Sequence, residues 1–199
     1  MVERSLDMRK VIGPTPIPPT MKKDIKDNNN VIHFLFTGGT IDSYYEGTKD
    51  TVVPLEHSII PRVFGLLKLY IKTEFTEICM KDSRSLSDED MKNLLKTVEE
   101  SPHSHIIVTH GTYTMPDSAR YLQANLKRKD QTIVFTGSYI PIDGFSPSDG
   151  SFNLGYAIAR VQDLPSGIYV AMNGRVFNPA EIRKALYEGR FESIFGEKL

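Results

Sequence analysis

The sequence predicts a three-layer, doubly wound α/β fold with a mostly parallel sheet, and three observations support this. After residue 30, short β-rich apolar runs alternate with segments of helical periodicity. The run at 31–36 is almost continuously apolar, which is typical of a strand covered on both faces. Three predicted strands end in glycine and hydroxyl residues, at the edge where open α/β sheets bind ligands.

The individual elements follow from local patterns. Residues 55–70 are predicted to form an amphipathic helix despite Pro61, and residues 180–188 a closing helical stretch. Residues 87–100 form the clearest helix, because Ser87 can cap it and acidic residues follow at its positive end. Strands are also expected at 72–80, 105–109, 132–136, 167–172 and 175–177, helices at 116–126 and 152–161, and a tight turn at 173–174.

The composition restricts the classes of function. The 24 Lys+Arg and 25 Asp+Glu residues leave a net charge of −1, so the sequence predicts neither nucleic-acid nor membrane partners. The single cysteine, Cys79, excludes an internal disulfide framework and a cysteine-rich zinc site. The sequence shows no secretory pattern and no run of about 18 apolar residues, so we expect a cytoplasmic protein.

Two parts are expected along the chain. Residues 1–30 combine a proline-rich stretch with a run of lysine, aspartate and asparagine, and are predicted to be a flexible N-terminal arm. The alternative is an arm that docks on a neighbouring subunit through Ile12 and Ile17. Residues 31–199 are predicted to form one α/β domain, which is long enough for a single large core.

The same residue types recur where three of the predicted strands end. Glycine lets backbone N–H groups approach a ligand, and such groups can hold an anion or an oxyanion. Tight turns use the same residues, but the recurrence favours a site rich in hydroxyl groups. The three segments are Thr37-Gly38-Gly39-Thr40, Thr109-His110-Gly111-Thr112 and Thr136-Gly137-Ser138.

Other known fingerprints do not fit these segments. The pair Gly38-Gly39 lacks the third glycine of the dinucleotide-binding pattern, and neither a phosphate-binding loop nor a Gly-x-Ser-x-Gly elbow is present. The histidines do not form a metal-ligand spacing with carboxylates, so no metal site is expected. His33 and His105 are interpreted as structural residues, because each lies within a predicted strand.

On these residues the chain resembles the amino-terminal domain of the bacterial-type L-asparaginase/glutaminase family, over about 31–186. Two signatures carry the resemblance, Thr37-Gly38-Gly39-Thr40-Ile41 and Thr109-His110-Gly111-Thr112-Tyr113-Thr114-Met115. Asp82-Ser83, the segment 135–138 with Pro141, and the segment 148–154 support it. The resemblance implies a flavodoxin/Rossmann-like asparaginase N-terminal domain, without a cofactor, that acts on a small-molecule amide or amino-acid-like substrate.

The resemblance also implies roles for individual residues. Thr40 falls on the family's nucleophile and Thr112 on its second catalytic threonine. Lys184 falls on the lysine that partners that threonine. Tyr45, in preference to Tyr44, falls near the activating tyrosine of a mobile loop. The implied substrate-binding residues are Gly39, Ser83, Arg84, Gly111 and Tyr113, of which Ser83 matches a serine that holds the substrate carboxylate.

General chemistry is consistent with these roles. A threonine hydroxyl is a poor nucleophile and needs a nearby base. A buried lysine can have a pKa low enough to take a proton, here through Thr112. Backbone N–H groups at the glycine-flanked turns would stabilise the oxyanion. The expected mechanism is acyl transfer to Thr40, followed by attack of water on the ester.

The sequence departs from the family pattern at two positions of the site. Tyr113 stands where the family has the aspartate that pairs with the substrate α-ammonium, a contact worth roughly 1.5–3 kcal/mol. Arg84 stands where a small polar residue usually assists, and its charge would repel an ammonium group. The sequence also stops at Leu199, without the family's carboxy-terminal domain, so we expect a homodimer or a higher homo-oligomer.

Three functional interpretations follow. The first is an asparaginase-type amidohydrolase that releases ammonia through a threonine nucleophile, with a substrate other than simple L-asparagine. The second is a catalytically inactive small-ligand-binding or interaction module derived from an asparaginase domain, which the loss of the aspartate at Tyr113 would favour. The third is a partial enzyme that needs a separate chain to complete its site.

Overall fold

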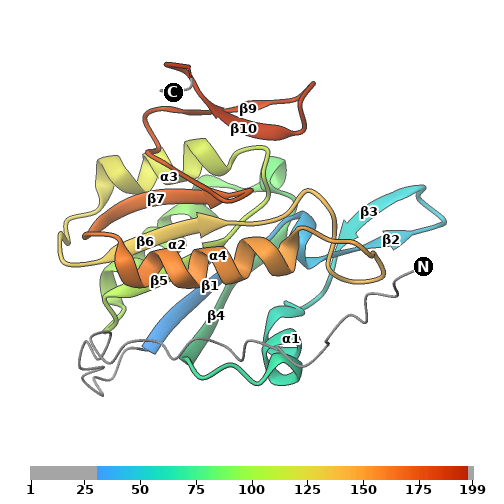
Figure 1. The fold of residues 1–199 in the computed structure, drawn as a ribbon, viewed down its shortest axis with the longest axis horizontal. Coiled ribbons are helices and arrows are strands. Elements are labelled where there is room, and N and C mark those ends of the chain that lie inside the picture. Colours follow the sequence, from blue (N-terminus) through green and yellow to red (C-terminus); the bar gives the residue numbers. More distant parts are fainter. Residues whose placement is uncertain (1–30, 197–199) are drawn as a thin grey trace, which may run out of the picture.

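A six-stranded sheet forms the centre of the molecule in a computed structural model that describes residues 31–196 (Figure 1). Its strand order is β4-β1-β5-β6-β7-β8, and every neighbouring pair is parallel except β7 and β8. The fold therefore has the mostly parallel sheet that the sequence predicts. The strands are β1 (Val31–Gly38), β4 (Lys72–Lys81), β5 (His105–Thr109), β6 (Thr132–Thr136), β7 (Gly167–Met172) and β8 (Arg175–Phe177).

Helices cover both faces of this sheet, which gives the three predicted layers (Figure 1). Helices α1 (Ile60–Leu67) and α4 (Gly150–Asp163) lie on one face, and α2 (Asp88–Glu100) and α3 (Met115–Asn125) lie on the other. Adjacent strand residues point to opposite faces, so Ile106 belongs to the core under α2 and α3 and Ile107 to the core under α4. Both side chains are fully buried, as expected for a strand covered on both sides.

Most local predictions are confirmed. Ser87 caps α2 through a capping box, in which its side chain and that of Asp90 each accept a backbone N–H of the other residue. Asn173 and Gly174 both have positive φ angles and form the tight turn between β7 and β8. His33 is structural, because its two ring nitrogens lie 2.9 Å from the hydroxyls of Ser101 and Thr76.

The helix predicted at 55–70 is confined to α1. Pro61 fits in its first turn, and residues 55–59 precede it as irregular chain. The helix ends at Lys68, which adopts a left-handed conformation with φ of 53°. The prediction was therefore too long at both ends, because the apolar spacing continues past the residues that are helical.

The helix predicted at 180–188 is wrong. The segment contains strand β9 (Ile182–Ala185), which pairs antiparallel with β10 (Arg190–Ser193) above β7 and α3 (Figure 1). The buried side chains of Ile182 and Ala185 are three residues apart, a spacing that imitates a helix. The main-chain carbonyl of Ile182 accepts a hydrogen bond from Arg120 of α3, which fixes the hairpin to the domain.

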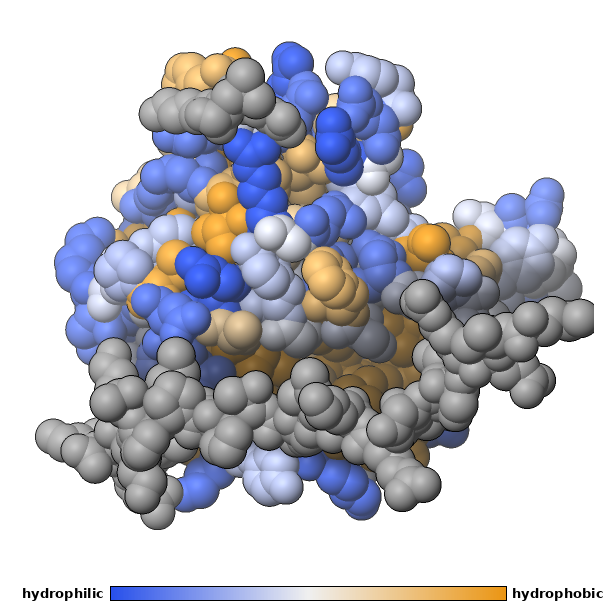
Figure 2. Space-filling view, in the orientation of Figure 1, coloured by the Kyte–Doolittle hydropathy of each residue, from blue (hydrophilic) through white to orange (hydrophobic). Residues whose placement is uncertain are grey.

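A second hairpin projects from the domain beside the carboxyl ends of the parallel strands (Figure 1). It consists of β2 (Ser43–Glu46) and β3 (Thr51–Pro54), paired antiparallel. Tyr44 and Tyr45 therefore lie on a regular strand, where the family resemblance implies a mobile loop. In the space-filling view of Figure 2, this projection lies at the right and has hydrophobic surface where it meets the domain.

The predicted N-terminal arm, residues 1–30, lies outside the described residues. Within residues 31–196, no helix has both the length and the apolar character needed to cross a bilayer. In that same part of the chain, no group of three histidine, cysteine or acidic side chains is arranged to hold a metal ion.

Candidate active site

The site lies where the strand order reverses. The chain passes from β1 to β4 on one side and returns to β5 on the other, so β1 and β5 are neighbours in the middle of the sheet. Open α/β sheets bind ligands outside the carboxyl ends of the strands at such a point. Thr40 follows β1 and Thr112 follows β5, so the fold brings both threonine-bearing turns to this crevice.

The turns after β1 and β5 touch at their glycines. Gly39 has φ of 82°, and a Cβ atom added to it would lie only 2.3 Å from the backbone nitrogen of Gly111. Only glycine allows the two backbones to approach so closely. Each glycine is followed directly by a threonine. Thr40 and Thr112 therefore lie next to the two residues, Gly39 and Gly111, at which the turns touch.

The third glycine segment packs on the second in the same way. A Cβ atom at Gly137 would lie 2.3 Å from the carbonyl oxygen of His110. His110 is fully buried, and burial lowers its pKa to about 4, so it is neutral at physiological pH. The recurring glycines thus have a packing role that the sequence interpretation, which assigned them to backbone donors, did not include.

Lys184 of β9 reaches the second threonine. Its Nζ donates a hydrogen bond to Thr112 Oγ1 at 2.7 Å, and Thr112 is buried. Desolvation is the main reason that the pKa of Lys184 is lowered. The positive charge of Arg84 lowers this pKa further, and the carboxylate of Asp82 opposes the shift.

Two tyrosine rings flank the amine of Lys184. Its Nζ lies 5.7 Å from the ring centroid of Tyr113 and 5.1 Å from that of Tyr139. Sequence reasoning missed Tyr139, although it directly follows the Thr136-Gly137-Ser138 segment. Its phenol oxygen is buried without a hydrogen-bond partner among the described residues, and its ring packs against Phe191 of β10.

Arg84 lies beside the same tyrosine. Its guanidinium is 5.6 Å from the centroid of the Tyr113 ring and makes two hydrogen bonds to Asp82, at 2.9 and 3.0 Å. These bonds hold the pKa of the Asp82 carboxyl below its usual value. Arg84 and Tyr113 both remain more than half exposed, with Arg84's side chain at 65% and Tyr113 at 53%. The ring of Tyr113 thus lies close to two cationic groups, and one of them already has a carboxylate partner.

Ser83 follows the end of β4 and packs against the segment that carries Thr112. It is buried, and a Cβ atom at Gly111 would lie 2.7 Å from the Ser83 Cβ. The Ser83 carbonyl accepts a hydrogen bond from Thr114 Oγ1 at 2.9 Å, and its Oγ accepts the Thr114 N–H at 3.4 Å. The structure thus brings Gly39, Gly111, Ser83 and Thr112 together.

The hydroxyl groups of the two hairpin tyrosines form hydrogen bonds within the hairpin itself. The Tyr45 hydroxyl donates to Asp50 at 2.5 Å and the Tyr44 hydroxyl to Glu46 at 3.2 Å, so both bonds stay within the hairpin. Together with the loop at 143–145, the two tyrosines line an open cleft of about 590 Å³. The choice between Tyr45 and Tyr44 as the residue that approaches the nucleophile stays a prediction.

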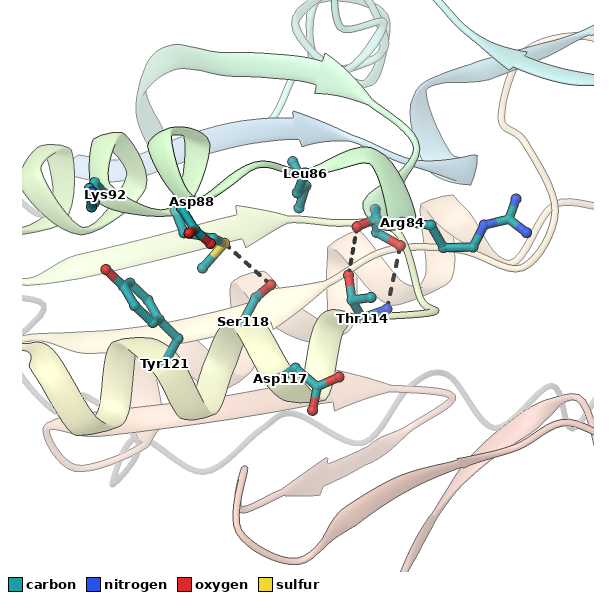
Figure 3. Close-up of a pocket in the computed structure, with 10 residues that line it drawn as sticks. Arg84, Leu86, Asp88, Lys92, Thr114, Asp117, Ser118 and Tyr121 are labelled. Atoms are coloured by element: carbon teal, nitrogen blue, oxygen red, sulfur yellow. Dashed lines mark hydrogen bonds between the residues drawn. The ribbon is translucent and has the colours of Figure 1, made fainter.

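A separate groove of about 550 Å³ separates α2 from α3 (Figure 3). Tyr121 points into it on the side of Lys92, whereas the Arg84 side chain extends away from it (Figure 3). Ser83 and Thr114 form one end of its lining. Thr40, Thr112 and Lys184 do not line the groove, so the threonine site and the groove are distinct and adjoin at Ser83.

The fold and these threonine-bearing turns define a doubly wound α/β domain with its crevice between β1 and β5. The chain belongs to the asparaginase family, because the family model described as "Asparaginase, N-terminal" matches residues 31–192. The predicted family resemblance is confirmed. The match ends within β10 and therefore includes Lys184 as well as both threonine segments.

Individual relatives agree with this assignment. L-asparaginase 2 of Escherichia coli K12 is 35% identical over 165 residues, which are 77% of this chain and 46% of the relative. The glutaminase-asparaginase of Acinetobacter glutaminasificans is 28% identical over 176 residues, covering 79% of this chain and 50% of the relative. The chain thus spans about half the length of these relatives.

Solved structures support the fold. The thermostable L-asparaginase from Thermococcus kodakarensis superposes with a TM-score of 0.67 at 26% identity, over 82% of this chain and 51% of that one. A probable cytoplasmic L-asparaginase from Campylobacter jejuni gives a TM-score of 0.69 at 24% identity, over 82% and 53%. The predicted fold class is confirmed by these neighbours.

Proposed function

We propose that this domain is an asparaginase-type amidohydrolase with Thr40 as its nucleophile. The observation that carries the proposal is the 2.7 Å hydrogen bond between Lys184 and Thr112, on a turn that touches the Thr40 turn through Gly39 and Gly111. Threonine becomes an effective nucleophile only with a base nearby, and an amine of lowered pKa supplies one.

The proposed reaction has two steps. In the neutral form of Lys184, the Thr112 hydroxyl donates to Nζ and accepts the proton removed from the attacking hydroxyl. Thr40 Oγ1 attacks the amide carbonyl, the C–N bond breaks, and the nitrogen leaves as ammonia after taking the proton that Thr40 gave to the Thr112–Lys184 pair. A water molecule then attacks the ester, which releases the carboxylic acid and restores the Thr40 hydroxyl.

The substrate is proposed to differ from L-asparagine. Tyr113 supplies no negative charge for an α-ammonium group, and the guanidinium of Arg84 and the amine of Lys184 lie 5.6 and 5.7 Å from the centroid of its ring. Asp82 compensates Arg84 in part, so the site is less cationic than two free charges would make it. We expect a small amide that lacks the α-ammonium group, or one with an additional carboxylate or phosphate.

The remaining predicted residues have supporting roles in this proposal. Buried Ser83, at the end of β4, binds the substrate carboxylate, and backbone N–H groups near Gly39 and Gly111 stabilise the oxyanion. Tyr45 is the proposed activating tyrosine, and Tyr44 is the alternative on the same hairpin. Both would have to exchange their present partners, Asp50 and Glu46, for the site.

A panel of amides tests the proposal. Ammonia release is measured with asparagine, glutamine, their des-amino analogues and amides that carry a second anion, for wild type, Thr40→Ala and Thr97→Ala. Thr97 is a partly exposed threonine of α2 whose hydroxyl donates to the Asn93 carbonyl, and it serves as the control. Loss of release only in Thr40→Ala supports the nucleophile.

Two outcomes would contradict parts of the proposal. If asparagine is the best substrate, the altered specificity is wrong. If no amide is hydrolysed while small amides raise the thermal stability of the domain, the inactive binding module is the better description.

We also propose that the chain self-associates. The β9–β10 hairpin that carries Lys184 exposes four large apolar side chains, namely Leu186, Tyr187, Ile194 and Phe195. Light scattering coupled to size-exclusion chromatography would give the mass in solution. A monomer at all concentrations would overturn this proposal, and it would leave the hydrolase proposal unaffected.

A further inference from the structure

A buried carboxylate lies two residues beyond the proposed nucleophile. Asp42 ends the single-turn helix η2 (Thr40–Asp42) and has no solvent exposure. Its Oδ1 accepts hydrogen bonds from Ser58 Oγ and from the backbone N–H of Ile59, both at 2.9 Å. Its Oδ2 has no partner among the described residues. Neither the sequence motifs nor the proposed chemistry accounts for this group.

The main chain of Asp42 makes two further contacts. Its N–H donates to the Gly39 carbonyl at 3.1 Å, and its carbonyl accepts the N–H of Leu55 at 2.8 Å. Leu55 is the first residue after β3, and Ile59 is the residue from which α1 begins. Asp42 therefore joins the Thr40 turn to the return strand of the tyrosine hairpin and to the start of α1.

We propose that Asp42 is a positioning residue that fixes the hairpin carrying Tyr44 and Tyr45 relative to Thr40, and that it holds the hairpin more firmly when neutral than when ionised. The structural part of this inference stands on the contacts of Asp42 alone. Its catalytic consequence rests on the proposed function, because it requires that Thr40 and a hairpin tyrosine act together.

The physical reason is the cost of burying a charge. An ionised carboxylate in a dry site loses its hydration, and one of its two oxygens here receives no hydrogen bond in return. Burial raises the pKa of Asp42 to about 6, although the bonds from Ile59 and Ser58 oppose the shift. The neutral acid keeps Oδ1 as an acceptor for both donors. Ionisation above this pKa therefore favours opening of the segment.

The charged neighbours act in the same direction. Glu77 of β4 faces Asp42, and its negative charge also raises the pKa of Asp42. Glu77 accepts the backbone N–H of Ser58 at 2.8 Å and pairs with His57 at 2.9 Å. Glu77 raises the pKa of His57. When His57 is protonated, its ion pair with Glu77 stabilises the position of residues 57–58. A test must separate the titration of His57 from that of Asp42.

Hydrogen exchange measured by mass spectrometry is the direct test. Deuterium uptake of peptides covering 43–54 and 55–67 is followed from pH 5 to pH 8. Each observed exchange rate is compared with the intrinsic exchange rate at the same pH, which gives the protection. In the wild type we expect protection of the Leu55 and Ile59 amides to fall about tenfold between pH 5 and pH 7.5. In Asp42→Asn, which keeps the Oδ1 acceptor without a charge, we expect most of this fall to disappear, with only the contribution of His57 left.

Two further variants define the interpretation. His57→Gln removes the neighbouring titration and is expected to keep most of the pH dependence of the wild type. Ser58→Ala removes one of the two donors to Oδ1 and is expected to lower protection at every pH. The inference is overturned if protection in Asp42→Asn falls with pH as in the wild type, or if the wild type shows no fall. If Asp42→Asn does not fold, His57→Gln provides the test. Loss of the pH dependence in His57→Gln would assign that dependence to His57 and would overturn the inference.

The catalytic consequence has its own measurement. On any amide that the panel identifies, kcat/KM of the wild type should fall above about pH 6 relative to Asp42→Asn, in addition to the limb from Lys184. If exchange behaves as expected but no amide is hydrolysed, the proposed function fails and the structural link stands. If amides are hydrolysed with identical pH profiles in both proteins, the positioning role fails and the proposed function stands.

Discussion

The amine of Lys184 donates to the hydroxyl of Thr112 at 2.7 Å, although the two residues are 72 positions apart in the chain. This contact depends on the β9–β10 hairpin, which buries Phe191 in the core and places Lys184 over the end of β5.

Replacement of Lys184 by methionine should therefore lower kcat by about 10²–10⁴-fold while the domain stays folded. Ammonia release and circular dichroism check this, with Lys127→Met, an exposed lysine, as the control. Unchanged kcat in Lys184→Met would remove the lysine from the mechanism.

The pKa of Lys184 determines a second prediction. Because desolvation lowers this pKa below the usual 10.5, kcat/KM should rise with pH as the amine loses its proton, with a midpoint below that value. The unfolded chain binds this proton more tightly, so the contribution of Lys184 to stability increases as pH rises through the same interval. Tyr113→Asp places a carboxylate beside the amine and should move the midpoint upward. Tyr113→Phe is the matched control and should leave it in place.

The same substitution tests specificity. Tyr113→Asp restores a negative charge where the family has one, so the variant should gain turnover of L-asparagine by roughly one to two orders of magnitude. Turnover of an amide without an α-ammonium group should fall or stay constant. Competition assays with the two substrates measure the ratio directly. Equal effects on both substrates would mean that Tyr113 does not contribute to recognition of the ammonium group.

The raised pKa of Asp42 has an effect on stability that is independent of catalysis. A carboxyl with a folded-state pKa of about 6 and a usual value of 3.8 binds its proton more tightly in the folded state. The free energy of unfolding therefore decreases as pH rises from about 4 to 6, by about 1–3 kcal/mol. Asp42→Asn should recover that amount at pH 7 and change little at pH 4. Urea denaturation at the two pH values measures both, and equal effects at the two would contradict the argument.

The sheet and the threonine site could be predicted because their signals are local. The apolar run of β1 and the glycine segments specify strands and turns without reference to the rest of the chain. The segment at 180–188 could not be predicted as a strand, because Ile182 and Ala185 have helical spacing and the partner strand β10 decides the structure. Tyr139 and Asp42 were missed for a related reason. Their importance comes from what the fold places beside them, namely Lys184 for one and Ile59 for the other.

The contact between the two threonine-bearing turns leads to the final prediction. Gly39 combines φ of 82° with a Cβ position only 2.3 Å from the backbone of Gly111, so Gly39→Ala must separate the two turns. Backbone strain and displacement together should cost about 3 kcal/mol or more in stability and move Thr40 away from Thr112.

Gly155→Ala is the matched control, because its added methyl group meets no atom within 4 Å in the middle of α4. This control should stabilise the domain by about 0.5–1 kcal/mol, since alanine has the higher helix propensity. Thermal and urea denaturation measure both variants. If the two substitutions have similar effects, the close approach of the turns is not what holds the site together.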